Sequence, residues 1–310
     1  MNTIRKPNLF MIGGPKCGTT SFQEYLAGHP HIFMSEPKEP CYFDKDIPFP
    51  SSPRNDGEYM RCFAGATERH IIIGEASTNY LYSKVAVANI LAFSPAARFI
   101  VMLRNPIEMA ASLHSEAVKT LTEDVCDFRK AWGLQEERRQ GLSLPRLCYQ
   151  KDFALYGDFC KLGSQLQRLF RLVNRERVHV IVFDDLKNHA RRRYQDTLRF
   201  LQLQDDGRTE FPIRNAFQQP RLGLMRDSAM LLGAIRNRIP IRRGLGIIRG
   251  ITRLTSKPGL RTPLPLDFHQ ELADYFRSDV TLLGELLNRN FSPWLNIPVA
   301  NDIARNRAYA

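Results

Sequence analysis

The stretch NLFMIGGPKCGTTS, residues 8–21, decides the fold. It starts as a short apolar run typical of a buried strand and continues through a glycine-rich turn into a helix expected over about residues 19–27. Glycines let the chain turn tightly with its N–H groups exposed, and these groups together with the positive end of a helix bind anions. Further donors in the stretch are Lys16, Thr19, Thr20 and Ser21. We therefore expect an anion-binding loop between this strand and this helix.

Three more apolar runs of strand length follow: HIIIG at 70–74, RFIVML at 98–103 and VHVIVF at 178–183. Each is continuous rather than alternating, as in strands that are covered on both faces. Helical patterns lie between and after them, at about 84–92, 106–120, 153–173 and 187–202. This alternation predicts an α/β fold, a P-loop-like three-layer α/β/α arrangement around a central parallel sheet.

Composition agrees with a folded domain that has an anionic partner. The 310 residues include 44 Lys and Arg against 32 Asp and Glu, a formal charge of +12, and 43% are hydrophobic. This apolar content excludes disorder as the main state. Residues 211–265 hold eleven Lys and Arg against Asp227 alone, so +10 of the charge lies there. A positive excess favours a phosphate ester, an acidic glycan, a membrane surface or nucleic acid as partner.

We expect one domain over residues 1–310. It would consist of a nucleotide-binding core at 8–205, a basic acceptor or lid segment at 211–265 and a C-terminal helix at 268–295, which makes the C-terminal part helical and basic. The apolar run at 9–12 is too short for a signal peptide, and no run approaches the ~18 apolar residues of a membrane span. The six cysteines are scattered without metal-ligand spacing. We read them as reduced thiols in a cytoplasmic protein that has no metal site.

A nucleoside triphosphate loop is the obvious alternative for the anion site. Gly13 and Gly18 have the spacing of the G-x-x-x-x-G-K-[ST] motif, but Thr19 stands where the motif has lysine. The lysine is inside the loop, at Lys16, and the strand 98–103 is followed by Arg104 rather than by a metal-binding acid. The pattern therefore favours a phosphate that lysine and amides bind without Mg²⁺, and a P-loop kinase stays open as an alternative.

Arg104 is a candidate for a second phosphate. It follows a strand, where parallel-sheet proteins bind ligands. Pro106 favours the first turn of a helix, so Ser112 would lie about two turns inside that helix. An arginine fork and a hydroxyl in this arrangement are suited to hold a phosphate.

These two motifs together resemble those of the sulfotransferases that use 3′-phosphoadenosine 5′-phosphosulfate. PKCGTTS at 15–21 is similar to their 5′-phosphosulfate loop, and RNPIEMAAS at 104–112 to their 3′-phosphate segment. KEPCYF at 38–43 resembles the carbohydrate-type branch, near heparan sulfotransferases and many bacterial enzymes. Weaker matches follow in family order: GEAS at 74–77, LYGDF at 155–159, VHVIVFDDL at 178–186 and LLNRNFSPW at 286–294.

The resemblance implies roles for particular residues. Lys16 would contact the bridging oxygen and stabilise the leaving phosphate, and Glu39 would be the general base that takes a proton from the acceptor hydroxyl or amine. The 5′-phosphate would be held by Lys16, Cys17, Gly18, Thr19, Thr20 and Ser21. The 3′-phosphate would be held by Arg104 and Ser112, and Arg214 and Arg221 lie near the expected nucleotide-binding turn. The implied acceptor is a glycan or a small metabolite, and the product nucleotide is 3′,5′-adenosine bisphosphate.

Two positions depart from the heparan-type pattern. Ser77 stands where those enzymes have a lysine shortly after a Gly-Glu pair, and Cys41 stands where many relatives have histidine. The basic segment 211–265 is read either as contact with an anionic acceptor or a membrane surface, or as a solvated helix pair. Its few aromatic residues argue against nucleic acid. A nucleotide-binding or surface-binding module without activity stays open as a non-enzymatic alternative.

Overall fold

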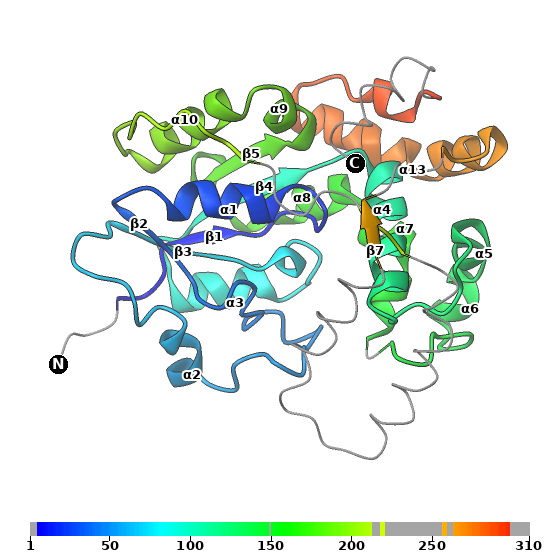
Figure 1. Cartoon of the computed structure of the whole chain (residues 1–310), viewed down its shortest axis with the longest axis horizontal. Coiled ribbons are helices and arrows are strands. Elements are labelled where there is room, and N and C mark those ends of the chain that lie inside the picture. Colours follow the sequence, from blue (N-terminus) through cyan, green and yellow to red (C-terminus); the bar gives the residue numbers. More distant parts are fainter. Residues whose placement is uncertain (1–4, 149, 213–217, 221–255, 259–262, 298–310) are drawn as a thin grey trace. The chain divides into compact units, whose positions relative to one another are not determined.

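The computed structural model describes residues 5–148, 150–212, 218–220, 256–258 and 263–297 (Figure 1). The chain divides into two compact units. The first unit comprises residues 1–109, 161–215 and 278–292, and the second comprises residues 110–160, 216–277 and 293–310. Arg214, Arg221 and most of the basic segment 211–265 lie outside the described residues. The prediction of a single domain over 1–310 stays a prediction.

The first unit is built on a five-stranded parallel sheet of order β2-β3-β1-β4-β5. Its strands are β1 (Leu9–Met11), β2 (Ile32–Met34), β3 (Ile72–Ala76), β4 (Arg98–Leu103) and β5 (Val178–Val182). The central strands are mostly apolar because both faces are covered, and all three residues of β1 are fully buried; Glu75 of β3 is a buried exception. The predicted α/β fold with a central parallel sheet is confirmed.

Helices cover both faces of this sheet (Figure 1). Helix α1 (Thr19–Ala27) contacts α10 (Ala190–Leu201), and α3 (Ala86–Phe93) contacts α8 (Leu162–Leu172). The chain moves from β1 to β2 in one direction and from β3 to β4 and β5 in the other, so right-handed crossovers put the connecting helices on opposite faces. The predicted bounds of α1 and β4 match the structure.

The register of the strands places the carboxyl ends of three strands at one edge of the sheet. In β1, Leu9 pairs with Gly74 of β3 and with Arg98 of β4. The carboxyl ends of β1, β3 and β4 are therefore neighbours, and the segments that follow them meet at this edge. Beyond β3 lies the short helix η1 (Thr78–Tyr80), and the N–H of Leu81 after it donates to the carbonyl of Ile12 after β1 (3.1 Å).

Several predicted helices end or break where the sequence pattern continued. The helix expected at 153–173 is the short helices η2 (Lys151–Ala154) and α7 (Tyr156–Phe159), followed by α8. The carboxylate of Asp279 accepts from the N–H groups of Gly163 and Ser164 (2.7 and 2.8 Å), which caps α8 from a distant segment. The helix expected at 187–202 is α9 (Phe183–Asn188) and α10, separated by His189 at φ −141°.

The C-terminal helix expected at 268–295 is also shorter. Helix α13 (Leu266–Leu287) ends because Asn288 adopts a left-handed φ of 48° and the N–H of Arg289 bonds back to the carbonyl of Gly284 (3.0 Å). This is the Schellman pattern of a helix end. The chain then forms the short helix η4 (Ser292–Leu295).

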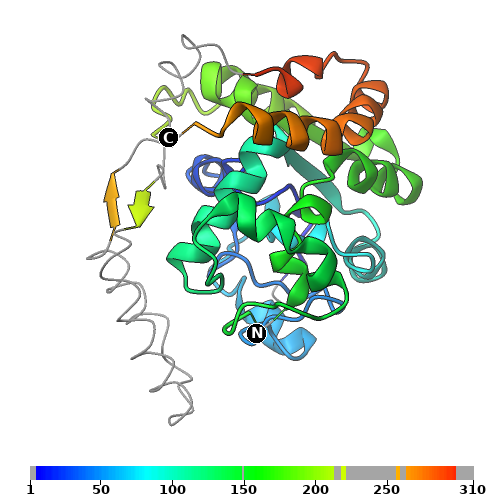
Figure 2. The same cartoon turned by 90° about the vertical axis from the view of Figure 1, so that its right-hand side faces the viewer.

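The second unit is mainly helical. Helices α4 (Pro106–Lys119), α13 and η4 each run across the boundary between the units, and α5 (Phe128–Gly133), α6 (Gln135–Arg139), η2 and α7 lie within the second unit. The strands β6 (Gln218–Pro220) and β7 (Ser256–Pro258) form a short antiparallel pair (Figure 2). Edge-to-face aromatic contacts join α5 to α13, such as Phe128 with Phe268 (5.4 Å between ring centroids).

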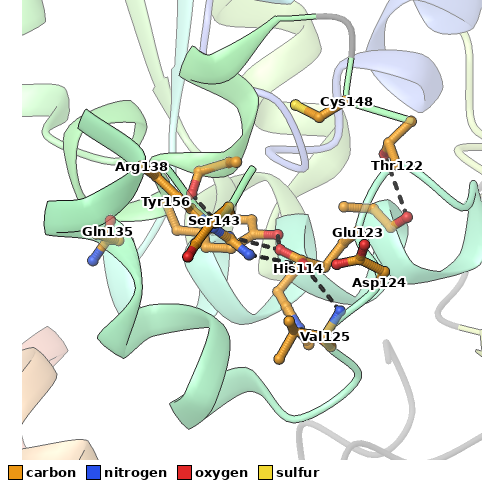
Figure 3. Close-up of polar contacts among 12 residues, drawn as sticks. His114, Thr122, Glu123, Asp124, Val125, Gln135, Arg138, Ser143, Cys148 and Tyr156 are labelled. Carbon is orange, nitrogen blue, oxygen red and sulfur yellow. Dashed lines mark hydrogen bonds and ion pairs between the residues drawn. The ribbon is translucent and has the colours of Figure 1, made fainter. Parts of the chain in front are cut away.

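A buried ion pair holds the helices of the second unit (Figure 3). Arg138 and Glu123 are fully buried and bond in a bidentate manner (2.8 and 2.9 Å), and Tyr156 donates to Glu123 (2.7 Å). The N–H of Val125 also donates to Glu123 (3.0 Å). Burial alone would raise the pKa of Glu123, but these hydrogen bonds outweigh it and hold the pKa below its ordinary value.

Candidate functional site

The anion loop joins β1 to α1, and glycine is needed at both of its ends. A Cβ on Gly13 would lie 2.1 Å from the backbone nitrogen of Met102 in β4, so no larger residue fits. Gly18 has a φ of 83° and stands at the N-cap of α1. Lys16, between them, also has a left-handed φ, 64°. The loop therefore turns tightly against β4 at the carboxyl edge of the sheet.

The start of α1 is suited to an anion. Gly18 has no side chain to cap α1, and the first turn of the helix contains no acidic residue. The hydroxyl residues Thr19 and Ser21 are buried there, and Thr20 is half-buried. The first N–H groups of a helix have no partner within it, and they carry the positive end of the helix dipole. Loop and helix together present donors to a phosphate group.

Cys17 has a packing role in this loop. Its side chain is fully buried and its thiol lies 3.5 Å from the carbonyl of Pro15. Burial raises the pKa of the Cys17 thiol to about 12. The thiol is therefore protonated at neutral pH and places no negative charge beside a bound phosphate.

Arg104 follows β4 and is bonded to the anion loop. Its guanidinium donates to the carbonyl of Lys16 (2.8 Å) and forms two bonds to the carboxylate of Glu108 (2.8 and 3.2 Å). It also lies over the ring of Phe183, 4.6 Å from the centroid. Arg104 is only 9% exposed, so its direction is fixed by these contacts. The structure thus brings together Lys16 and Arg104, which were predicted from separate motifs.

Ser112 lies on α4, as predicted, and its side chain is buried. Arg104 belongs to the first unit and Ser112 to the second, so the binding of one phosphate by both residues stays a prediction.

Glu39 lies in a bent segment at the same edge of the sheet. Glu39 and Cys41 have left-handed φ values of 57° and 49°. The carboxylate of Glu39 is 2.5 Å from the ammonium of Lys38 and accepts a long hydrogen bond from Thr78 (3.4 Å). Its side chain is 43% exposed, so it can reach a bound molecule. Thr78 belongs to η1 after β3, so the structure places Glu39 near the ends of the central strands.

A buried carboxylate that the sequence analysis did not assign lies beside this segment. Glu75 of β3 is fully buried and accepts hydrogen bonds from Tyr59 (2.5 Å), Ser77 (2.6 Å) and Tyr80 (3.2 Å). Burial raises its pKa to about 7, although the three hydroxyl groups act in the opposite direction. An acid inside the apolar run at 71–76 was the available signal, because unpaired acids are rarely buried.

Asp44 is a second buried carboxyl group. It is 1% exposed, and neither of its carboxylate oxygens has a hydrogen-bond partner among the described residues. Burial raises its pKa to about 7.

In the described ranges, no group of three or more His, Cys, Asp or Glu residues is arranged to hold a metal ion. No described helix is both long enough and apolar enough to cross a membrane.

Known proteins similar to this chain are sulfotransferases. No family model matches it. A solved structure of a sulfotransferase from Alicyclobacillus acidocaldarius superposes with a TM-score of 0.69 and 24% identity, over 94% of this chain and all of that one. This likeness shows that the chain has a sulfotransferase fold.

Two curated relatives agree over shorter stretches. The chain is 31% identical over 118 residues to the membrane-associated sulfotransferase kil1 of Dictyostelium discoideum, covering 37% of this chain and 24% of that one. It is 31% identical over 144 residues to human carbohydrate sulfotransferase 15, covering 33% of this chain and 26% of that one. The chain thus spans about a quarter of the length of these relatives.

Proposed function

We propose that this chain, which has a sulfotransferase fold and is similar to sulfotransferases in sequence, is a sulfotransferase itself. The donor would be 3′-phosphoadenosine 5′-phosphosulfate, and the acceptor a hydroxyl or amine of a glycan or small metabolite. The observation that carries the proposal is the hydrogen bond from Arg104 to the carbonyl of Lys16, which joins the two predicted phosphate motifs in one site.

In this proposal the anion loop binds the 5′-phosphate through N–H groups at the start of α1 and through Lys16. Arg104 binds the 3′-phosphate, since its guanidinium is held at the carboxyl edge of the sheet by Phe183 and the loop. The carboxylate of Glu108 forms an ion pair with that guanidinium, so the guanidinium would bind Glu108 and the phosphate together. Fixed donors around a leaving group act as preorganised electrostatic stabilisation.

The chemical step is an in-line displacement at sulfur. The acceptor oxygen or nitrogen forms a bond to sulfur while the bond from sulfur to the bridging phosphate oxygen breaks. Glu39 takes the proton that the acceptor loses, and Lys16 stabilises the charge that develops on the departing nucleotide phosphate. The step needs no metal ion, because lysine and backbone amides take the place of a cation bridge.

Thr78 and Lys38 support this assignment of Glu39. Both contact its carboxylate, and Lys38 supplies a positive charge beside it, while Ser77, after β3, stands in place of the lysine of heparan-type enzymes. Contact of the basic segment 211–265 with an anionic acceptor or a membrane surface stays a prediction, as does a cytoplasmic location. Nucleic acid is not among the partners that we propose.

A ligand-binding experiment tests the proposal before any acceptor is known. A ligand that binds only the native state raises the melting temperature by mass action. We expect 3′,5′-adenosine bisphosphate to stabilise the protein, AMP to do so less, and ATP with Mg²⁺ to have little effect. Lys16→Met should weaken the binding of the bisphosphate. Lys151→Met, which changes an exposed lysine of η2, should leave this binding unchanged. Stabilisation by ATP with Mg²⁺ alone would instead indicate a P-loop kinase.

A further inference from the structure

The segment that follows Glu39 is bonded to hydroxyl groups rather than to a strand. The N–H of Cys41 donates to the hydroxyl of Ser77 (3.1 Å). The N–H groups of Tyr42 and Phe43 donate to the hydroxyl of Tyr80 (2.8 and 3.3 Å). Three consecutive backbone donors of a buried, irregular segment are thus satisfied by two side chains.

Both hydroxyl groups are oriented by Glu75. Ser77 and Tyr80 each donate their single proton to its carboxylate, so their lone pairs face the backbone N–H groups. Glu75 is fully buried near the carboxyl end of β3, the strand beside central strand β1, and Tyr59 of α2 (Asp56–Arg61) donates to it as well. The contacts form a continuous connection from the sheet to the segment that carries Glu39.

The backbone that this connection holds is strained. Glu39 and Cys41 both have left-handed φ values, which side chains other than glycine rarely adopt. Such conformations persist only where the surrounding structure determines them, and they are concentrated at functional sites. The hydrogen bond from Cys41 to Ser77 acts on one of the two strained residues.

We propose that Ser77 and Tyr80, oriented by Glu75, are positioning residues that fix the backbone next to Glu39 and thereby aim its carboxylate at the acceptor. The inference rests on the proposed role of Glu39 as general base. It gives Ser77 a function of its own at the position where the resembling enzymes have lysine. Ser77 and Tyr80 act through Glu39 and the backbone, without touching the substrate.

Hydrogen exchange tests the physical part of the proposal without any acceptor. Ser77→Ala removes the acceptor for the N–H of Cys41, so we expect a peptide spanning residues 40–44 to exchange at least about tenfold faster. The matched control is Ser35→Ala. Ser35 is also a buried serine of the first unit, but its hydroxyl has no hydrogen-bond partner among the described residues. Unchanged exchange in Ser77→Ala would overturn the proposal.

Turnover tests the functional part. The probe is transfer of ³⁵S from labelled donor to a panel of chondroitin, heparosan and 4-nitrophenol. We expect Ser77→Ala and Tyr80→Phe to lower turnover about 10- to 100-fold with bisphosphate affinity unchanged, because small displacements of catalytic groups cost this much. Tyr59→Phe is the control for Tyr80, since it removes a hydroxyl from the same carboxylate without releasing the segment.

A double variant separates positioning from general destabilisation. If Ser77 acts through the base, Ser77→Ala should cost less than about threefold once Glu39→Gln is present. Full additivity of the two substitutions, or an equal loss in Tyr59→Phe and Tyr80→Phe, would overturn the positioning role. A wild-type protein that neither binds the bisphosphate nor transfers sulfate would refute the proposed function, and with it the role of Ser77 and Tyr80 in catalysis. The exchange experiment would still decide whether these two residues fix the backbone next to Glu39.

Discussion

Replacement of Arg104 by alanine should weaken the binding of 3′,5′-adenosine bisphosphate far more than the binding of AMP. The guanidinium is 9% exposed and held by Glu108, Phe183 and the carbonyl of Lys16. Its proposed bond to the 3′-phosphate is charge-assisted and contributes about 1.5–3 kcal/mol, which corresponds to a loss of roughly 10- to 100-fold in affinity. AMP lacks that phosphate, so for AMP the substitution removes only the hydrogen bond by which Arg104 supports the anion loop.

The free energy that Arg104 contributes by supporting the anion loop can be given separately. The bond from Arg104 to the Lys16 carbonyl measures 2.8 Å, and an ordinary hydrogen bond of this kind contributes about 0.5–1.5 kcal/mol. AMP affinity should therefore fall by only about 2- to 10-fold. Isothermal titration calorimetry with both nucleotides measures the two losses. Arg98→Ala is the control, because Arg98 stands at the opposite end of the same strand. If Arg104→Ala leaves the affinity ratio of bisphosphate to AMP at the wild-type value, the 3′-phosphate assignment is wrong.

Three further predictions follow from buried or strained acids. Glu39→Gln should lower single-turnover sulfate transfer by about 10²–10⁴ with bisphosphate affinity unchanged, while Glu36→Gln in the same segment costs only a few-fold; activity of Glu39→Gln near wild type would contradict the base role. Burial raises the pKa of Glu75 from 4.5 to about 7, so its contribution to stability is full below pH 4.5 and is lost as the pH rises through 7. Chemical denaturation should show Glu75→Gln gaining about 3 kcal/mol relative to wild type between pH 4.5 and 7.5, and parallel pH profiles would refute the shift. Glu123→Ala leaves the charge of Arg138 buried and unpaired, so urea denaturation should show the free energy of unfolding falling by about 3–5 kcal/mol. A fall below about 1 kcal/mol would contradict the structural role of this ion pair.

The sequence was most informative where local pattern and tertiary contact agree. β4 and α1 have the predicted bounds because a continuous apolar run and a glycine at the helix start are local signals. The strand β2 was missed, since only three residues pair and the chain turns away directly after them. The helix breaks before α8 and before α10 were also missed. One depends on the carboxylate of Asp279, more than a hundred residues along the chain from Gly163.

The candidate site divides in the same way. The anion loop and Arg104 could be predicted because glycine spacing and strand-end position are visible in sequence. Glu75 could not be assigned, because Tyr59, Ser77 and Tyr80 converge on it only when η1 and α2 pack beside β3. Pro37 and Pro40, on either side of Glu39 in the sequence, give no sign of its left-handed backbone.

The central claim is sulfuryl transfer without a metal ion, and one competition experiment tests it most directly. The wild-type protein is given ³⁵S-labelled 3′-phosphoadenosine 5′-phosphosulfate and γ-³²P-labelled ATP with the acceptor panel, once with Mg²⁺ and once with EDTA. We predict ³⁵S in the product under both conditions and no transferred ³²P. Incorporation of ³²P that requires Mg²⁺, with no ³⁵S in the product, would contradict the account and indicate a kinase.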